Sequence, residues 1–475
     1  GWQLEENDKP DVLFFGTSYV HYGILCGELW EQNGITAYNC GVDGQDIDVT
    51  YWAVRNALDY VTPKVVVVDI FAASWSWVNE ATVEDFHNTM DWVPPYSKTK
   101  AALMISLPKD QRLDLMLPFV HYHSRWEELK KNDFVKESHV FGGTSYSGVE
   151  RQLKQEQVSK NEMGDVKEFA LQAVENMIQY CESKGIKVVF TVMPGSHTPR
   201  QQKDLNTVIA LGKEYGVETI DLHDYDVVNT KTDFYDMRDM GNDATASHIN
   251  YSGAKKVTRF LGDWLQEKYS LKNHHGESGY ERWEEKEILY RQQKSAELEQ
   301  EEGISGLLVR LADKDYSTVV MIPAGSHTAK DSETKALLEN LGLNPDWERI
   351  QNEYYLGIAD SYNDRIIELW GKGEYTWCDK DGNVFANVNF DSDLGQSYTN
   401  PGIICNGEDY SLRVYNDVED QPLAVDIQIL ALENRSGNVV CSRGYDQIPE
   451  TWNYRQIAVG QELGKGIIVD DADDS

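Results

Sequence analysis

The feature that most constrains the fold is a regular alternation of short apolar runs and amphipathic helical patterns over the first 270 residues. Helical periodicity predicts helices at Thr50–Tyr60, Val166–Lys184, Pro199–Tyr215 and Gly253–Tyr269. Apolar, β-branched-rich runs predict strands at Asp11–Phe15, Ile35–Asn39, Lys64–Ile70, Lys187–Met193 and Val217–Leu222. Strands separated by helices pair in parallel and need helices on both faces of the sheet. We therefore expect a doubly wound, flavodoxin-like α/β domain, whose ligands bind beyond the carboxyl ends of the strands.

The remaining sequence predicts further parts around this domain. The α/β domain is expected over residues 1–275, and the alternation is interrupted by an aromatic-rich insertion over residues 71–164. A charged helical stretch over residues 276–303 predicts a linker helix. Residues 304–475 predict a mixed α+β domain, with the hairpin signals Asp381-Gly382 and Ser436-Gly437 in its β-rich second half.

Composition excludes several classes of partner and cofactor. The formal net charge of -35 argues against nucleic acid, because a phosphate backbone would be repelled. No run of 18 apolar residues is present, so no membrane-spanning helix is expected. The six cysteines form no CxxC pair, and we assign no metal site and no cofactor. The chain begins at Gly1 without methionine, so an N-terminal signal or membrane tether outside this sequence stays open.

A serine and a histidine stand out as candidate catalytic residues. Ser18 follows the first predicted strand in DVLFFGTSYV, which places it at the carboxyl edge of the sheet. His248 lies in a polar loop, just before a helix that Asn250 or Ser252 could cap. A hydroxyl nucleophile needs a base within hydrogen-bond reach, and His248 could serve as that base. In contrast, His197 and His327 belong to two GSHT segments that we interpret as helix starts.

The motifs GTSYV, YNCGVDGQ (residues 38–45) and SHINYSGAKK together resemble the SGNH (GDSL-like) hydrolase superfamily. Within it, the chain resembles the bacterial branch of cell-surface polysaccharide O-acetylation proteins and D-alanyl transfer proteins of teichoic acids. The resemblance implies that Ser18 is the nucleophile and His248 the general base. It further implies that the backbone N–H groups of Gly44 and Ser18 form the oxyanion hole. A carbohydrate or acyl-ester substrate and an extracytoplasmic or cell-surface location follow from the same resemblance.

Two departures from the family pattern bear on activity. The family has an aspartate three residues before the histidine, where this chain has Thr245. Asp243 could orient His248 instead, the enzyme could use a Ser–His dyad, or activity could be lost. The family also has a Gly-x-Asn-Asp block after its third strand, whose asparagine donates to the oxyanion. This chain has no asparagine between Val65 and Val78, and Gln45 and Ser74 are candidate substitutes.

Other candidate substrate contacts are His123 and Arg125, in the segment HYHSRW. The C-terminal region resembles domains related to the interleukin-like epithelial–mesenchymal transition inducer fold, which implies a glycan- or partner-binding module.

The leading hypothesis is a serine esterase or O-acyltransferase acting on acyl groups of an extracytoplasmic bacterial glycan. The alternative is a catalytically inactive glycan-binding or scaffold protein with the same fold. The sequence leaves the oligomeric state open.

Overall fold

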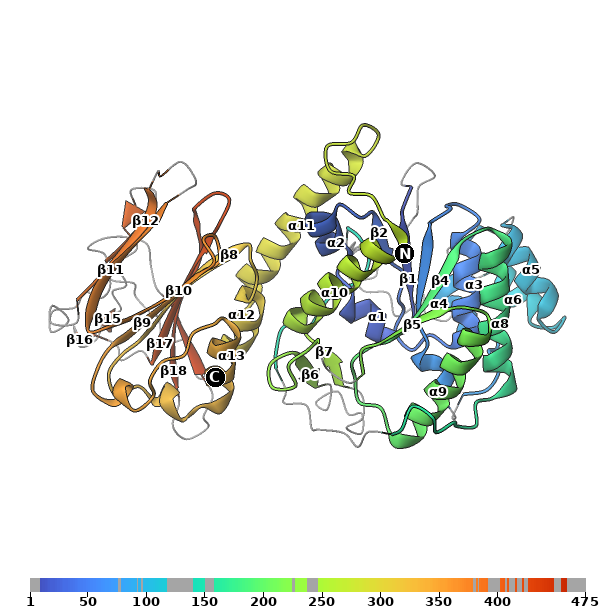
Figure 1. Cartoon of the computed structure of the whole chain (residues 1–475), viewed down its shortest axis with the longest axis horizontal. Coiled ribbons are helices and arrows are strands. Elements are labelled where there is room, and N and C mark those ends of the chain that lie inside the picture. Colours follow the sequence, from blue (N-terminus) through green and yellow to red (C-terminus); the bar gives the residue numbers. More distant parts are fainter. Residues whose placement is uncertain are drawn as a thin grey trace. The chain divides into compact units, whose positions relative to one another are not determined.

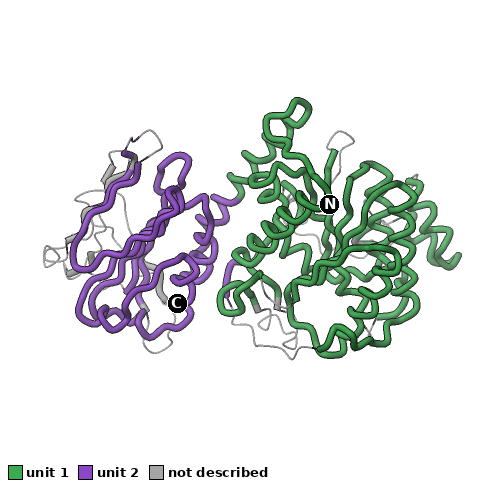
Figure 2. Tube along the Cα trace, viewed as in Figure 1, with its two compact units in different colours: residues 1–146, 150–293 green, residues 147–149, 294–475 purple. Residues whose placement is uncertain are grey.

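The computed structural model covers the chain as two compact units, residues 1–146 with 150–293, and residues 147–149 with 294–475 (Figure 2). It describes residues 9–75, 78–91, 93–94, 97–117, 140–149, 158–223, 227–236, 247–378, 382, 384–391, 402–405, 408–409, 415–416, 421–422, 426–447 and 454–458. The division between the units falls within helix α11 (Glu281–Gln300), in the predicted linker region.

The first unit is built on a five-stranded parallel sheet, which confirms the predicted fold class. Its strand order is β2-β1-β3-β4-β5, the flavodoxin-like order. The strands are β1 (Val12–Phe15), β2 (Ala37–Asn39), β3 (Val65–Asp69), β4 (Lys187–Val192) and β5 (Glu218–Asp221). Strands β1 and β3 are buried along their whole length, as expected for a sheet covered on both faces.

Helices cover both faces of this sheet (Figure 1). Helices α2 and α10 pack together on one side, and α3 packs against α8 on the other. The helices of this layer structure are α1 (Ser18–Gly23), α2 (Cys26–Asn33), α3 (Ile47–Ala57), α8 (Glu168–Ser183), α9 (Pro199–Glu214) and α10 (Tyr251–Tyr269). Helix α3 begins at Ile47, three residues before the predicted start at Thr50, with Asp46 at the N-cap position. Thr198 forms a capping box with Gln201 at the start of α9, which confirms the first GSHT segment as a helix start.

The described part of the insertion is helical and has a core of its own. It contains η1 (Phe71–Ser74), α4 (Val83–Met90), α5 (Lys98–Ser106) and α6 (Arg112–Met116). Apolar side chains from these helices surround Phe86 and Met90 and pack against Val49 of α3. The insertion is therefore anchored to the helix that follows the second strand.

In its described residues, the second unit combines helices with a ten-stranded sheet. Helices α12 (Ile304–Leu311) and α13 (Ser332–Asn340) accompany the strands β8 (Tyr316–Ile322), β9 (Tyr355–Asp360), β10 (Arg365–Trp370), β11 (Lys372–Cys378), β12 (Val384–Asp391), β13 (Gly402–Cys405), β14 (Glu408–Asp409), β17 (Ile427–Glu433), β18 (Val439–Gln447) and β19 (Tyr454–Ala458). All its recorded strand pairs are antiparallel, and Trp377 lies at the centre of its core. A separate small pair joins β15 (Tyr415–Asn416) to β16 (Gln421–Pro422). Gly382 and Gly437 adopt positive φ at the two predicted hairpin turns.

Candidate active site

Ser18 is the first residue of α1, directly beyond the carboxyl end of β1. Thr17 caps the helix, and its hydroxyl accepts a hydrogen bond from the Tyr19 N–H. Gly16 makes the sharp strand-to-helix turn with a φ of +155°, where a Cβ atom would lie 2.6 Å from Val20 and 2.9 Å from Asp69. Only glycine allows this close approach, so the turn presents the Ser18 hydroxyl at the edge of the sheet.

The structure places His248 next to Ser18, with 2.8 Å between His248 Nε2 and Ser18 Oγ. His248 lies in β7 (Ser247–Ile249), which pairs with β6 (Phe234–Asp236) ahead of α10. Asn250 caps α10 by accepting a hydrogen bond from the Gly253 N–H. The cap fixes the chain two residues after the histidine, while β6 fixes the histidine itself. A serine hydroxyl at this distance can donate its proton to a neutral imidazole.

The loop after β2 carries Gly44, the predicted oxyanion donor. Gly44 is exposed, with a φ of +66°, and within the described part of the chain its N–H makes no hydrogen bond to protein. The N–H of Ser18 is at the first position of α1, where no helical carbonyl can accept it. Both backbone donors could therefore bind a ligand oxygen, and their catalytic role stays a prediction.

Asn39 holds this loop against α1 and was not singled out by sequence reasoning. Its buried side-chain amide donates to the carbonyl oxygens of Val20 at 2.7 Å and Ile24 at 2.8 Å. Its Oδ1 accepts a hydrogen bond from the Gly41 N–H at 2.9 Å. One side chain thus joins the end of the nucleophile helix to the start of the Gly44 loop. The sequence did contain a signal for this residue, because Asn39 is the asparagine that begins the Asn-x-Gly-x-x-Gly pattern in YNCGVDGQ.

Asp43 makes a second link between the same two segments. Its carboxylate oxygens lie 2.7 Å from His21 Nδ1 and 2.7 Å from the Tyr22 hydroxyl, which donates to it. Burial opposes the charge on Asp43, but the hydrogen bonds from His21 and Tyr22 outweigh it and hold its pKa below the usual value. Burial, together with hydrogen bonds to Tyr146 and Asp43, raises the pKa of the Tyr22 phenol, which stays protonated as a donor.

Aromatic rings surround the Ser18–His248 pair. Tyr19 stacks on the His248 imidazole at a centroid distance of 4.8 Å, and Tyr22 meets it edge-on at 5.6 Å. Tyr146 stacks on Tyr22 at 4.1 Å and on Tyr235 at 4.5 Å. The rings of Tyr22, Tyr146 and Tyr235 are partly exposed. Together these three tyrosines, here called the tyrosine wall, form a partly apolar surface beside the nucleophile.

A buried carboxyl group, that of Asp69, occupies the end of β3. Asp69 Oδ1 accepts a hydrogen bond from the Met193 N–H at 3.0 Å, which ties the ends of β3 and β4 together. Burial raises the pKa of Asp69 to about 7, although hydrogen bonds from the Met193 and Phe71 backbone favour its charged form. No sequence pattern identified this residue, because an aspartate at a strand end is common.

The two candidate substitutes for the missing asparagine are buried and already hydrogen-bonded. Gln45 donates to Thr50 Oγ1 at 3.0 Å and accepts from Thr89 Oγ1 at 3.0 Å. Ser74 donates its hydroxyl proton to the Phe71 carbonyl at 2.7 Å. Among the described contacts, neither side chain is joined to Ser18, and their role at the substrate stays a prediction.

Three further predicted site residues lie outside the described residues. Asp243 is one of them, so the residue that orients His248 stays open, and His123 and Arg125 also fall there. No helix in the described part of the chain is long and apolar enough to cross a membrane.

No protein-family model matches this chain, and no match was found among curated proteins. Among solved structures, it is similar to a GDSL-like lipase from Bacteroides thetaiotaomicron, with 13% identity and a TM-score of 0.27 over 56% of this chain and 92% of the lipase. It is similar to a proposed acylhydrolase from Bacteroides fragilis, with 12% identity and a TM-score of 0.26 over 55% and 90% of the two chains. A proposed lipolytic protein of the G-D-S-L family from Desulfitobacterium hafniense shares 11% identity, with a TM-score of 0.28 over 53% and 97%. The case for a function therefore rests on the residues of the site itself.

Proposed function

We propose that this chain is a serine-dependent esterase or O-acyltransferase that works through an acyl-enzyme. The observation that carries the proposal is the 2.8 Å separation of Ser18 Oγ and His248 Nε2 at the carboxyl edge of the parallel sheet. The backbone N–H groups of Gly44, in the loop after β2, and of Ser18, at the start of α1, support it, since a tetrahedral oxyanion needs such donors.

The proposed reaction has two steps. His248 takes the Ser18 proton while Oγ attacks the ester carbonyl, and the oxyanion is held by the N–H groups of Gly44 and Ser18. Collapse of this intermediate expels the alcohol, which receives the proton from His248, and leaves the acyl group on Ser18. A water molecule or a sugar hydroxyl then attacks the acyl-enzyme, with His248 accepting its proton. Collapse of the second intermediate releases Ser18 Oγ, which takes that proton back from His248. Water gives hydrolysis and a sugar hydroxyl gives acyl transfer.

The proposed substrate is an acetylated extracytoplasmic bacterial glycan. The tyrosine wall supports a carbohydrate, because partly exposed tyrosines offer both apolar faces and hydroxyl groups to a sugar ring. The cell-surface location and the acetyl group rest on the sequence resemblance.

The test is release of acid from p-nitrophenyl acetate by the wild type and by Ser18→Ala. We expect a rate in the wild type that falls by at least about a thousandfold in the variant, because the nucleophile is lost. Labelling of Ser18 by a fluorophosphonate is the companion measurement, since it reports nucleophilicity even in a strict transferase. Absence of both turnover and labelling in folded wild type would refute the proposal and favour the inactive binding protein.

A further inference from the structure

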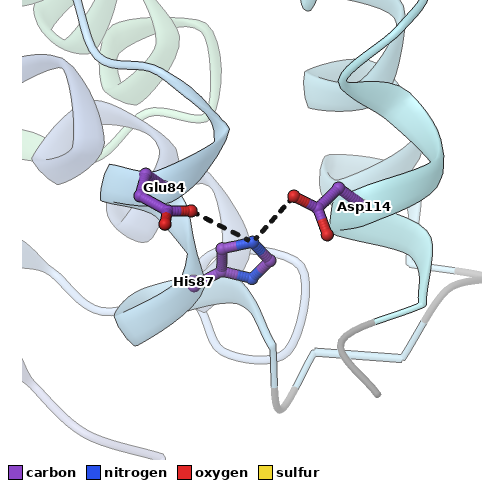
Figure 3. Close-up of side chains that lie close together, drawn as sticks. All are labelled: Glu84, His87 and Asp114. Atoms are coloured by element: carbon purple, nitrogen blue, oxygen red, sulfur yellow. Dashed lines mark ion pairs between the residues drawn. The ribbon is translucent and has the colours of Figure 1, made fainter. Parts of the chain in front are cut away.

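A second cluster of titratable side chains lies in the insertion, on helices α4 and α6 (Figure 3). Glu84 and His87 are three residues apart on α4, so they share one face of the helix. Asp114 of α6 faces them, and the two helices are held together by the apolar core of the insertion. Both helices thus direct charged groups to one point.

The distances in this cluster suit ligands around an ion. His87 Nε2 lies 3.7 Å from Asp114 Oδ2 and 4.0 Å from Glu84 Oε2, and all three ligand atoms lie within 4.8 Å of one another. A direct N–H···O hydrogen bond would span about 2.7–3.2 Å. Two ligands on a tetrahedral ion, with bonds of about 2.0–2.2 Å, lie roughly 3.4 Å apart and further when the angle opens. Small side-chain shifts would therefore admit an ion between the three groups.

The orientation of His87 also fits a ligand. Its imidazole is buried, with a side-chain exposure of 2%, and Nδ1 lies 2.7 Å from Asp91 Oδ1. A proton on Nδ1, donated to this carboxylate, directs the Nε2 lone pair toward Glu84 and Asp114. Metal-bound histidines are commonly oriented by a carboxylate in this way.

Negative charge gathers in the same place. The carboxylates of Glu84, Asp91 and Asp114 surround the His87 imidazole, while the Lys100 ammonium attracts Asp91. A cation bound between Glu84 and Asp114 would reduce the repulsion between their carboxylates.

We propose that Glu84, His87 and Asp114 bind a divalent transition-metal ion, best matched by Zn²⁺, that fastens α4 to α6. Imidazole with two carboxylates suits Zn²⁺ better than the harder Ca²⁺ or Mg²⁺. The sequence analysis assigned no metal, because the ligands come from two helices and form no recognised spacing. Thr89 of α4 donates to Gln45, the neighbour of Gly44, so the ion would steady a helix that supports the candidate oxyanion loop.

A second group, His275, Glu284 and Glu287, has similar spacing but different surroundings. The Arg291 guanidinium already pairs with Glu287, and Glu284 accepts a hydrogen bond from the Gly276 N–H. This group serves as an internal comparison for the proposed site.

The experiment is titration of the chelator-treated full chain with ZnCl₂ by calorimetry, with thermal unfolding measured in parallel. We expect one equivalent to bind to the first cluster and to raise the Tm. Asp114→Asn should lower the affinity at least about tenfold, because it removes a charged ligand while keeping the shape of a partly exposed side chain. Asp110→Asn, which removes an exposed charge nearby on the turn before α6, should bind like the wild type.

Several results would overturn the proposal. It fails if the folded wild type binds no Zn²⁺, or if Asp110→Asn loses as much affinity as Asp114→Asn. It also fails if Glu284→Gln abolishes binding and Asp114→Asn does not, since the second group would then be the site. His87→Gln should abolish binding, but because His87 is buried, Asp114→Asn with an unchanged circular dichroism spectrum is the deciding variant. None of these readouts depends on the proposed acyl chemistry.

Discussion

Replacement of Asn39 by alanine tests how the candidate oxyanion loop is held in place. The variant would leave the Ile24 carbonyl and the Gly41 N–H without the partner that Asn39 supplies, whereas the Val20 carbonyl keeps its bond from the Ile24 N–H. Two buried or partly buried groups that lose a hydrogen bond cost about 1–3 kcal/mol each, so we expect roughly 2–6 kcal/mol less stability.

The assay is urea unfolding of Asn39→Ala beside Asn161→Ala, in which the substituted side chain is exposed in a turn. Activity should fall further than stability alone explains: at temperatures where the variant stays folded, kcat for p-nitrophenyl acetate should drop at least about tenfold, because displaced oxyanion donors stabilise the transition state less well. A loss of stability below about 1 kcal/mol, or a kcat equal to that of Asn161→Ala, would refute the reasoning.

Two more predictions follow from the groups near the site. The pKa of Asp69 is raised to about 7 from 3.8, so its native form keeps a proton that the unfolded chain releases. Its contribution should be fully present below pH 3.8 and should be lost as pH rises through about 7, and urea unfolding at several pH values should show a flatter profile in Asp69→Asn. If the pH dependence of stability in Asp69→Asn equals that of the wild type, the titration belongs to another group and the prediction is wrong. Tyr146→Ala should lower kcat/KM for an acetylated oligosaccharide more than for p-nitrophenyl acetate, with Tyr146→Phe closer to wild type; equal losses on both substrates would argue against a sugar-binding tyrosine wall.

The fold of the first unit was predictable because its signals are local. The buried strands β1, β3 and β4 are short apolar runs, and the helices between the strands have clear periodicity, so the parallel order follows from general rules of chain connection. The same rules placed Ser18 at the carboxyl edge of the sheet, and the structure brings the His248 side chain within hydrogen-bond distance of it.

The supporting residues were harder to predict because their partners are distant in sequence or are backbone groups. Asn39 binds carbonyl oxygens that have no sequence signature, and the burial of Asp69 depends on how β4 closes over β3. Tyr146 reaches the site only because the end of the insertion pairs with Asn250 beside β7. Long-range packing of this kind requires the folded arrangement and not a local pattern.

The residue at the end of β3 cannot supply the side-chain amide that binds the oxyanion in the family pattern. Asp69 stands there with a buried carboxyl group whose oxygens accept backbone hydrogen bonds from Met193 and Phe71, and an aspartate has no amide donor for an oxyanion. The proposed stabilisation then falls to the backbone N–H groups of Gly44 and Ser18. The position of the Gly44 N–H depends on how rigidly its loop is held. Among the described contacts, the side chains of Asn39 and Asp43 join this loop to α1. Residues that never touch the substrate should therefore control the rate of this site more strongly than in a site that carries a side-chain donor.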